Sequence, residues 1–142
     1  MYNGRRSKKP LESKNEGYLV KAVAKMGGKA PKLTCMGMSG FPDRMILLPY
    51  GIVSYAEVKR PGEKPRPKQV ERMSELAALG FDVWWADNTD EIDRQLQRLG
   101  NAVTEAQASG KSKATIVQGT QAQIRPAAVF RIVTESGERK VK

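Results

Sequence analysis

The sequence predicts an α/β domain in which a mixed central sheet is flanked by helices, with the element order αβββαβα. Three observations point to this class. Three segments space their apolar residues at helical intervals, and the short runs between them are rich in β-branched and aromatic residues. A strand, a helix and a second strand follow one another between residues 52 and 86, which favours a parallel, right-handed crossover.

The first predicted element is a helix from Ser13, a suitable N-cap, to about Met26, ended by the pair Gly27-Gly28. Glu16 falls on its apolar stripe, which is unusual for a carboxylate. Either this side chain lies at the solvated end of the stripe or it serves a function there. The apolar members of the stripe are Leu19, Val20, Val23 and Met26.

Three strand candidates follow, over residues 32–38, 44–48 and 52–59. The tripeptide Pro49-Tyr50-Gly51 separates the second from the third and is typical of a tight turn. With Tyr50 at the centre, the numbers of paired residues sum to about 100. Asp43 is therefore predicted to face Glu57 across an antiparallel hairpin.

The rest of the core alternates helix and strand. A basic Pro/Gly-rich loop at 60–66 precedes a helix over about 67–79, which begins with Pro67 in its first turn. Residues 81–86 form a short apolar strand, and a last helix covers about 90–99, capped by Asn88 or Thr89. The predicted inward positions of these two helices are Val70, Met73, Leu76 and Ala77, then Ile92, Leu96 and Leu99.

Charge is concentrated at the two ends of the 142-residue chain, whose net charge is +10. We expect a flexible basic arm at 1–12, a core at 13–100 and a basic extension at 101–142. The extension begins as a polar linker at 101–113 and then holds short strands or little order. Cationic flanks favour a polyanionic partner such as DNA or RNA, although they can also serve solubility alone.

The residue types that the chain lacks narrow its chemistry. It has no histidine and one cysteine, Cys35, which excludes Ser-His-Asp and Cys-His catalysis, histidine-bound metals and an internal disulfide. Catalysis would rest on carboxylates, lysine, hydroxyl groups and an oxygen-bound ion such as Mg²⁺ or Mn²⁺. Without an apolar run of roughly 18 residues or a secretory signal, a cytoplasmic protein that avoids membranes is expected.

Asp43, Glu57 and Lys59 are the candidates for such chemistry. Glu57 and Lys59 share one face of their strand, whereas Val58 points to the other. Because adjacent carboxylates repel, Asp43, Glu57 and the Val58 carbonyl would bind a divalent cation. Lys59 would orient or deprotonate an attacking water, or hold a substrate phosphate. The alternative is turn chemistry at Asp43 and a solvated Glu–Lys pair.

The sequence G-F-P-D at 40–43, followed by E-V-K at 57–59, resembles the PD-(D/E)XK nuclease motif. The wider pattern over about 13–99 is similar to the VRR-NUC branch of that superfamily. It looks like a stand-alone, virus-type member, of the kind that resembles Holliday junction resolvases. The further features that carry the resemblance are Glu16 on the first helix, Gly27-Gly28, Lys32 before the first strand and Gln69 opening the next helix.

The resemblance implies a restriction-endonuclease-like core and hydrolysis of DNA phosphodiester bonds with Mg²⁺ or Mn²⁺. It further implies a homodimer that acts on branched or duplex DNA in recombination or repair, in the host cytoplasm if the chain is from a bacteriophage. Glu16 would aid metal or water binding, and Gln69 would orient Lys59 or a phosphate. Residues 101–142 match nothing in the family.

Two further groups of residues have both a functional and an ordinary interpretation. Trp84-Trp85 would stack on bases, but their place in a strand favours packing in the core or in a dimer. A non-catalytic nucleic-acid-binding module, or a nuclease subunit that depends on a helicase or recombination partner, remains an alternative function. The basic residues that would grip a DNA backbone, or simply be solvated, are Lys32, Lys64, Arg66 and Lys68.

Overall fold

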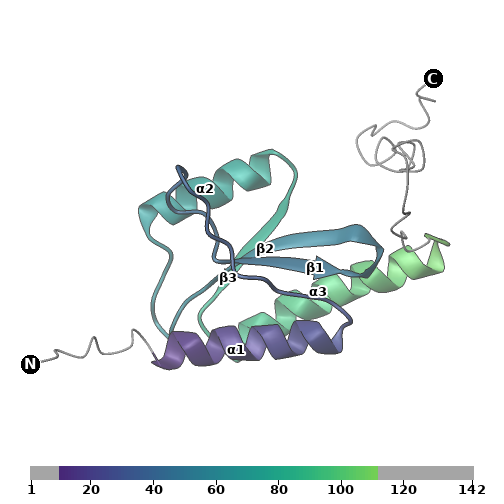
Figure 1. Ribbon diagram of the computed structural model, residues 1–142. Coiled ribbons are helices and arrows are strands. Elements are labelled where there is room, and N and C mark those ends of the chain that lie inside the picture. Colours follow the sequence, from purple (N-terminus) through teal and green to yellow (C-terminus); the bar gives the residue numbers. More distant parts are fainter. Residues whose placement is uncertain (1–9, 112–142) are drawn as a thin grey trace, which may run out of the picture.

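The computed structural model describes residues 10–111, and only the backbone of residues 10–13. The chain forms three layers (Figure 1): one helix covers one face of a sheet, and two helices cover the other. The first is α2 (Pro67–Ala78), and the pair is α1 (Pro10–Lys25) and α3 (Thr89–Ala108). The sheet contains, in this order, β1 (Arg44–Leu48), β2 (Ile52–Val58) and β3 (Asp82–Ala86).

The mixed sheet confirms the predicted α/β class. β1 and β2 are antiparallel, and Arg44 lies opposite Ala56, so the predicted pairing sum of 100 is correct. The turn is a short 3-10 segment, η1 (Pro49–Gly51), in which Tyr50 has a left-handed φ of 65°. β2 and β3 are parallel and are joined through α2, as the predicted crossover requires.

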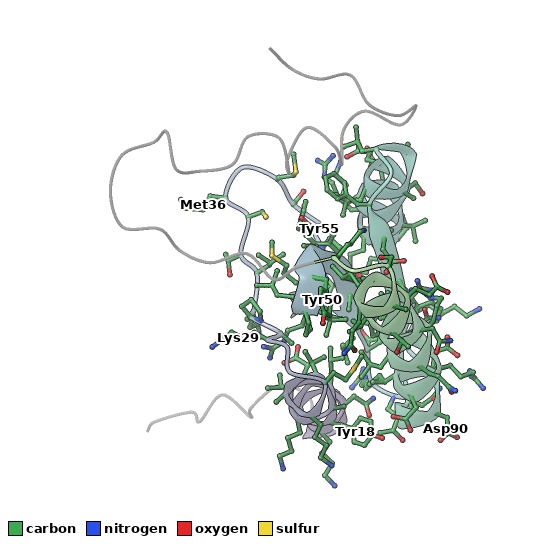
Figure 2. The ribbon with its side chains drawn as sticks, turned by 90° about the vertical axis from the view of Figure 1, so that its right-hand side faces the viewer. Tyr18, Lys29, Met36, Tyr50, Tyr55 and Asp90 are labelled. Atoms are coloured by element: carbon green, nitrogen blue, oxygen red, sulfur yellow. The ribbon has the colours of Figure 1, made fainter. Side chains whose placement is uncertain are left out.

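The predicted strand over 32–38 does not form, so the element order is αββαβα. The chain makes only isolated bridges to β1, from Lys29 to Leu47 and from Lys32 to Arg44. Pro31 lies between them and has no amide hydrogen to donate, which interrupts the ladder. Beyond it the segment becomes a loop, and Met36 points outward from its tip with 95% of its surface exposed (Figure 2).

Two helices are longer than predicted. α1 begins at Pro10, so Ser13 lies inside the helix and cannot cap it. Asn88 caps α3, as predicted, and α3 continues to Ala108 through residues whose composition predicts a linker. The predicted core boundary at residue 100 therefore falls inside a helix. The basic extension beyond 111, with its possible strands at 114–117 and 127–134, lies outside the described residues, as do residues 1–9 of the arm.

The hydrophobic core lies between the sheet and the pair α1 and α3. The helical periodicity predicts Val20, Val70 and Ala77 to face inward, but all three are exposed. Leu76 is the buried residue of α2, so this helix covers its face of the sheet more loosely. None of the described helices combines the length and apolarity needed to cross a membrane. The central core residues are Leu19, Val23, Ile46, Ala56, Val58, Ile92, Leu96 and Leu99.

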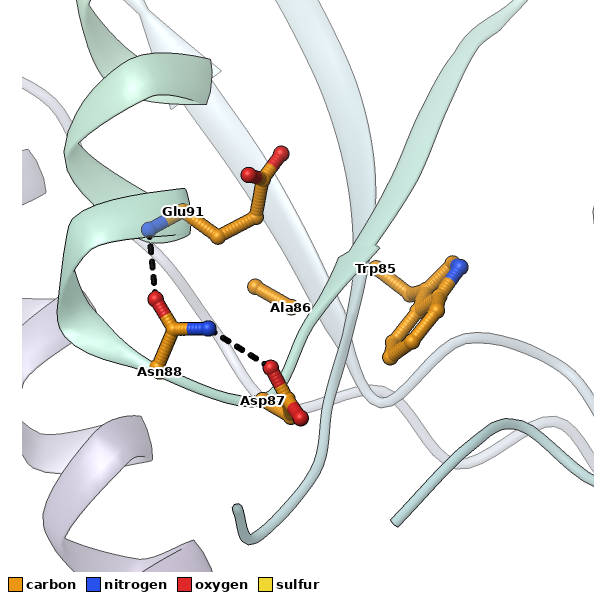
Figure 3. A pocket seen from close by; sticks show the side chains of 5 residues that line it. All are labelled: Trp85, Ala86, Asp87, Asn88 and Glu91. Atoms are coloured by element: carbon orange, nitrogen blue, oxygen red, sulfur yellow. Dashed lines mark hydrogen bonds between the residues drawn. The ribbon is translucent and has the colours of Figure 1, made fainter. Parts of the chain in front are cut away.

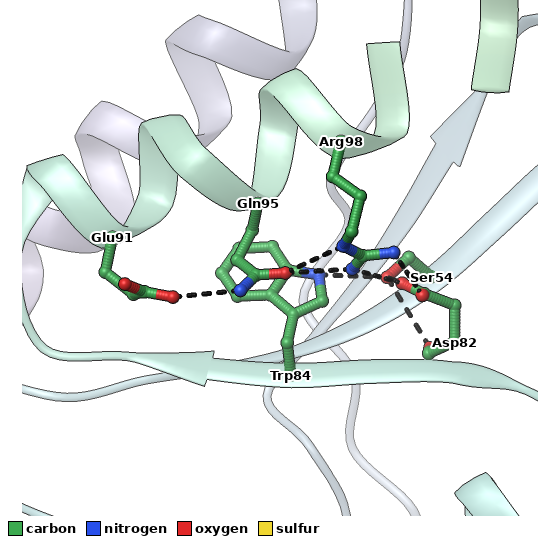
Figure 4. A network of polar contacts seen from close by, with 6 residues as sticks. All are labelled: Ser54, Asp82, Trp84, Glu91, Gln95 and Arg98. Carbon is green, nitrogen blue, oxygen red and sulfur yellow. Dashed lines mark hydrogen bonds and ion pairs between the residues drawn. The ribbon is translucent and has the colours of Figure 1, made fainter. Parts of the chain in front are cut away.

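A polar network joins α3 to the start of β2 and β3 (Figure 4). The Trp84 indole donates to the Ser54 hydroxyl at 3.0 Å, and that hydroxyl donates to the Asp82 carboxylate. Arg98 of α3 binds the other oxygen of Asp82 at 2.6 Å. Because Trp84 is buried and hydrogen-bonded, it serves packing, in agreement with the interpretation favoured by its strand position.

Replacing Gly28 by alanine is expected to lower the free energy of unfolding by about 1–3 kcal/mol. A Cβ at Gly28 would lie 2.7 Å from Leu48 Cδ2 and would also collide with the Leu47 carbonyl oxygen. The matched control is Gly17→Ala, where nothing lies within 4 Å and the helix should gain about 0.5–1 kcal/mol. Urea denaturation measures both changes. Equal stabilisation of the two variants would contradict the close approach of the Gly28 backbone to β1.

Candidate active site

The site lies at the open end of the β1–β2 hairpin, on the face that α2 covers. Asp43 directly precedes β1, and Glu57 and Lys59 lie at the end of β2. The Asp43 amide donates to Glu57 Oε2 at 3.1 Å, and Lys59 Nζ lies 2.9 Å from Glu57 Oε1. The structure therefore brings together the three charged groups that the hairpin register predicts.

Gln69 reaches the same carboxylate from the first turn of α2. Its amide nitrogen donates to Glu57 Oε1 at 2.6 Å, and its amide oxygen accepts the Arg66 backbone N–H at 2.8 Å. The second bond belongs to the capping of α2, so the start of the helix fixes the Gln69 side chain. Glu57 Oε1 thus accepts hydrogen bonds from both Gln69 and Lys59, whereas the resemblance implies Gln69 beside Lys59 or a phosphate.

The charges of this site are removed from water. Glu57 is 1% exposed and Lys59 is 2% exposed. The pKa of Glu57 is raised to about 7, chiefly by burial; the hydrogen bond from Lys59 opposes this shift, and the nearby Asp43 charge adds to it. Burial also raises the pKa of Asp43, followed by the charge of Glu16. Lys59 alone does not bring the pKa of Glu57 back to its ordinary range, and a divalent cation with oxygen ligands would supply the further positive charge that two ionised carboxylates need.

The proline before Asp43 gives a reason why the Val58 carbonyl suits the same cation. Continued by two further pairs, the β1–β2 register places Asp43 opposite Glu57 and then Pro42 opposite Val58. The Val58 carbonyl is directed towards β1, because its neighbour Lys59 uses its backbone N–H on the other side, at Ala86 of β3. Proline has no N–H to offer this carbonyl, so the ladder cannot continue there.

The ligand set in the protein is incomplete by itself. Within residues 10–111, no three acidic, histidine or cysteine side chains gather closely enough to hold an ion. Asp43, Glu57 and the Val58 carbonyl fit part of an oxygen coordination shell, and water or substrate oxygens would complete it. Such a shell is typical of Mg²⁺ and Mn²⁺, which keep several exchangeable ligands.

Glu16 lies at the border of the site rather than inside it. Its side chain is 15% exposed, accepts a hydrogen bond from Arg44 Nη2 at 3.2 Å and lies 3.9 Å from Lys32 Nζ. It is near enough to Asp43 to raise the pKa of that carboxyl. The alternative in which Glu16 sits at a solvated end of the stripe is therefore wrong, and its partners are cations.

Asn15 contacts the backbone of the candidate site, and sequence reasoning did not single it out. Its side chain is buried, and its amide nitrogen donates to the carbonyl oxygens of Lys59 and Asp87, each at 2.9 Å. The sequence held one signal: Asn15 stands four residues before Leu19 and eight before Val23, so it belongs to the buried stripe of α1.

The predicted DNA-contacting residues lie on exposed surface around the site. Lys64 and Arg66 are exposed in the loop between β2 and α2, and Lys68 on α2 pairs with Glu71 at 3.2 Å. The Lys32 side chain is 63% exposed. Although Lys68 pairs with Glu71 and Lys32 lies near Glu16, the side chains of these cations are exposed, so a polyanion can reach them.

Trp85 and a hollow at the end of β3 adjoin the site without belonging to it. Trp85 is paired with Glu57 in the sheet register and is 36% exposed, unlike the buried Trp84. Figure 3 shows the hollow between Trp85 and the start of α3, where Asn88 accepts the Glu91 N–H and donates to Asp87. Asp43, Glu57 and Lys59 do not line this hollow, and its carboxylates disfavour a phosphate there.

A mixed sheet that brings a Pro-Asp turn beside a Glu-x-Lys strand end defines a nuclease of the PD-(D/E)XK class. A solved structure of a "VRR_NUC domain" superimposes with a TM-score of 0.59 and 27% identity, covering 61% of this chain and 95% of that chain. A protein of Acyrthosiphon pisum secondary endosymbiont phage 1, named "Putative nuclease p44", is 43% identical over 79 residues, which are 56% of this chain and 85% of the relative. No family model matches the chain. The chain belongs to the VRR-NUC family and is a nuclease.

Proposed function

We propose that this nuclease is a metal-dependent endonuclease that hydrolyses DNA phosphodiester bonds and prefers branched DNA such as Holliday junctions. The observation that carries the proposal is the partly buried Asp43 next to the buried pair of Glu57 and Lys59. Two carboxylates with raised pKa values favour a cation, and binding alone gives no reason to place carboxylates where phosphates approach. The proposed setting is recombination or repair in the cytoplasm of a phage-infected cell.

Asp43, Glu57 and the Val58 carbonyl would hold Mg²⁺ or Mn²⁺, and Glu16 would support the ion from α1. When bound, the ion polarises the phosphoryl oxygen and stabilises the leaving oxygen. PD-(D/E)XK nucleases in general use divalent metals, and the candidate ligands of this chain are oxygen atoms, which suit such metals. Because Glu16 already pairs with Arg44, Glu16 would contact the ion through a water molecule rather than bind it directly.

Lys59 would orient the attacking water and neutralise charge on the phosphate. An ammonium group has three donors, and one of them is directed at Glu57 Oε1. The other two can hold a water and a phosphate oxygen at the same time. Gln69 would keep Glu57 in place through its 2.6 Å hydrogen bond, so that the carboxylate does not rotate when the ion enters. Because Glu57 and Lys59 are both buried, the electrostatic interaction between them is stronger than it would be in water.

Exposed cations around the site would bind the DNA backbone. Lys64, Arg66 and Lys68 follow the catalytic strand end directly, and Lys32 approaches from the segment beside β1. Phosphate contacts of this kind position nucleic acid without reading its sequence, which suits recognition of a DNA shape. The net charge of +10 supports the same substrate.

A homodimer would place two such sites on one branched substrate. Apolar side chains remain exposed on α2 and in the turn between α2 and β3, where Val70 is 47%, Leu79 74% and Phe81 47% exposed. Burying them against a second copy would be favourable at about 25 cal/mol per Å² of apolar surface. Light scattering should give a mass of twice the 15.7 kDa of the chain.

Cleavage of defined DNA substrates tests the function. We expect four-way junctions to be cut faster than flaps or linear duplex in Mg²⁺ or Mn²⁺, with no cutting in EDTA. A closed circular substrate distinguishes internal cutting from degradation at ends. Equal rates on junction and linear DNA would remove the proposed selectivity. Binding without cutting in any divalent metal would instead favour a non-catalytic binding module or a subunit that depends on a protein partner.

A further inference from the structure

β2 and β3 end side by side, and the last hydrogen bond between them runs from the Lys59 N–H to the Ala86 carbonyl at 2.8 Å. Beyond this bond the two strand ends are held by a side chain from another element. The amide nitrogen of Asn15, on α1, donates one hydrogen to the Lys59 carbonyl and one to the Asp87 carbonyl, both at 2.9 Å. Both donors of this NH₂ group are therefore used.

This junction is buried, so its hydrogen bonds matter energetically. Asn15 is 7% exposed, and it shares its helix face with Leu19 and Val23 in the core. A buried carbonyl that loses its donor costs about 1–3 kcal/mol of desolvation. If Asn15 were replaced by an apolar residue, the ends of β2 and β3 would have to move to find other donors or water.

The same junction also connects other parts of the site. Asp87 Oδ2 accepts the Gly62 N–H at 2.9 Å, which holds the basic loop at 60–66 against the end of β3. Glu16 follows Asn15 on α1, so the helix that holds the Lys59 backbone also places Glu16 beside Arg44. Asn15 therefore sets the distance between α1 and the end of β2.

We propose that Asn15 is a positioning residue for Lys59: its amide group fixes the Lys59 backbone and thereby the place of the ammonium group beside Glu57. The proposal rests on the proposed nuclease mechanism. The Lys59 side chain is long and has several rotatable bonds, so a shift of its backbone is passed on to Nζ. A misplacement of about 1 Å in a reacting geometry can cost about 10²-fold in rate.

Three variants test this with a graded number of donors. Asn15→Ala removes both donors, Asn15→Ser leaves one, and Val23→Ala is the control, because it removes a buried side chain from the same helix without touching Lys59. At saturating DNA and Mn²⁺, and below the unfolding temperature of each variant, we expect kcat to fall about 10- to 10²-fold in Asn15→Ala and less in Asn15→Ser. KM should change less than about twofold, and Val23→Ala should keep its kcat.

Hydrogen–deuterium exchange gives a readout that does not depend on activity. In Asn15→Ala we expect backbone amides of residues 57–63 to exchange faster than in the wild type, and in Val23→Ala to keep their rate. If the wild type cuts no DNA with any metal, the proposed function fails, and exchange alone decides whether Asn15 fixes this segment. A kcat of Asn15→Ala within about twofold of the wild type, or equal exchange over 57–63 in both variants, would overturn the proposal.

Discussion

The Lys59→Ala protein is expected to cut DNA about 10²- to 10⁴-fold more slowly than the wild type at saturating metal and DNA. The substitution removes the ammonium group that lies 2.9 Å from Glu57 Oε1 and that would orient the attacking water. DNA affinity should remain nearly unchanged, because Lys59 is 2% exposed and the exposed cations of the neighbouring loop are retained. Single-turnover cleavage of a labelled junction measures the rate, and a gel-shift assay measures the affinity.

Lys68→Ala is the matched control for this experiment. Lys68 is also a lysine near the site, but its side chain is 50% exposed and pairs with Glu71 on the surface of α2. It should weaken DNA binding modestly and leave the rate at saturation unchanged. If the Lys59→Ala protein cut as fast as the Lys68→Ala protein, the mechanism proposed for Lys59 would be wrong.

Metal affinity is expected to depend steeply on pH below neutrality. The pKa of Glu57 is raised to about 7 by burial, and the ion binds the ionised carboxylate. Each pH unit below 7 should therefore lower the apparent Mn²⁺ affinity about tenfold, whereas affinity above pH 7 to 8 should be nearly constant. The raised pKa of Asp43 should steepen this dependence at lower pH. Calorimetric titration with Mn²⁺, without DNA, measures the effect.

The metal-free protein should show the opposite trend in stability. Since the pKa of Glu57 is higher in the folded chain than the ordinary 4.5, its protonated form favours folding. This contribution is complete below about pH 4.5 and is lost as pH rises through about 7, where added Mn²⁺ should restore stability. In Glu57→Gln the midpoint near pH 7 should disappear from both measurements. A wild-type Mn²⁺ affinity that is flat from pH 5.5 to 7.5 would contradict the assignment of Glu57 as a ligand.

The hairpin register is predictable because local sequence determines it. Tyr50 stands in a tripeptide that forces a tight turn, and every pairing along β1 and β2 then follows from counting outward. Counting residues alone is therefore enough to place Asp43 beside Glu57. The absence of the strand expected at 32–38 has an equally local cause in Pro31, whose missing N–H outweighs the apolar run that follows it.

Long-range contacts cannot be predicted in this way. Asn15 and Glu16 differ by about 100° around α1, and both lie at helical spacing from Leu19 and Val23, so the stripe alone does not decide which of them the sheet buries more deeply. The hydrogen bond from Gln69 to Glu57 depends on how α2 packs, and a resemblance names Gln69 without naming its partner. The extension of α3 to Ala108 depends likewise on tertiary packing, because Ala106 is buried in a segment whose composition resembles a linker.

Pro42 belongs to the Pro-Asp half of the nuclease motif, and the residue opposite it, Val58, belongs to the Glu-x-Lys half. Pro42 and Val58 are far apart in sequence, yet Pro42 ends the hydrogen-bond ladder of β1 and β2 next to Asp43 and Glu57. A backbone oxygen that would otherwise be shared within the sheet is thereby offered to a ligand from outside. In this protein the proposed active site therefore lies where the regular pairing of β1 and β2 stops, so the end of the sheet and the proposed site of chemistry coincide.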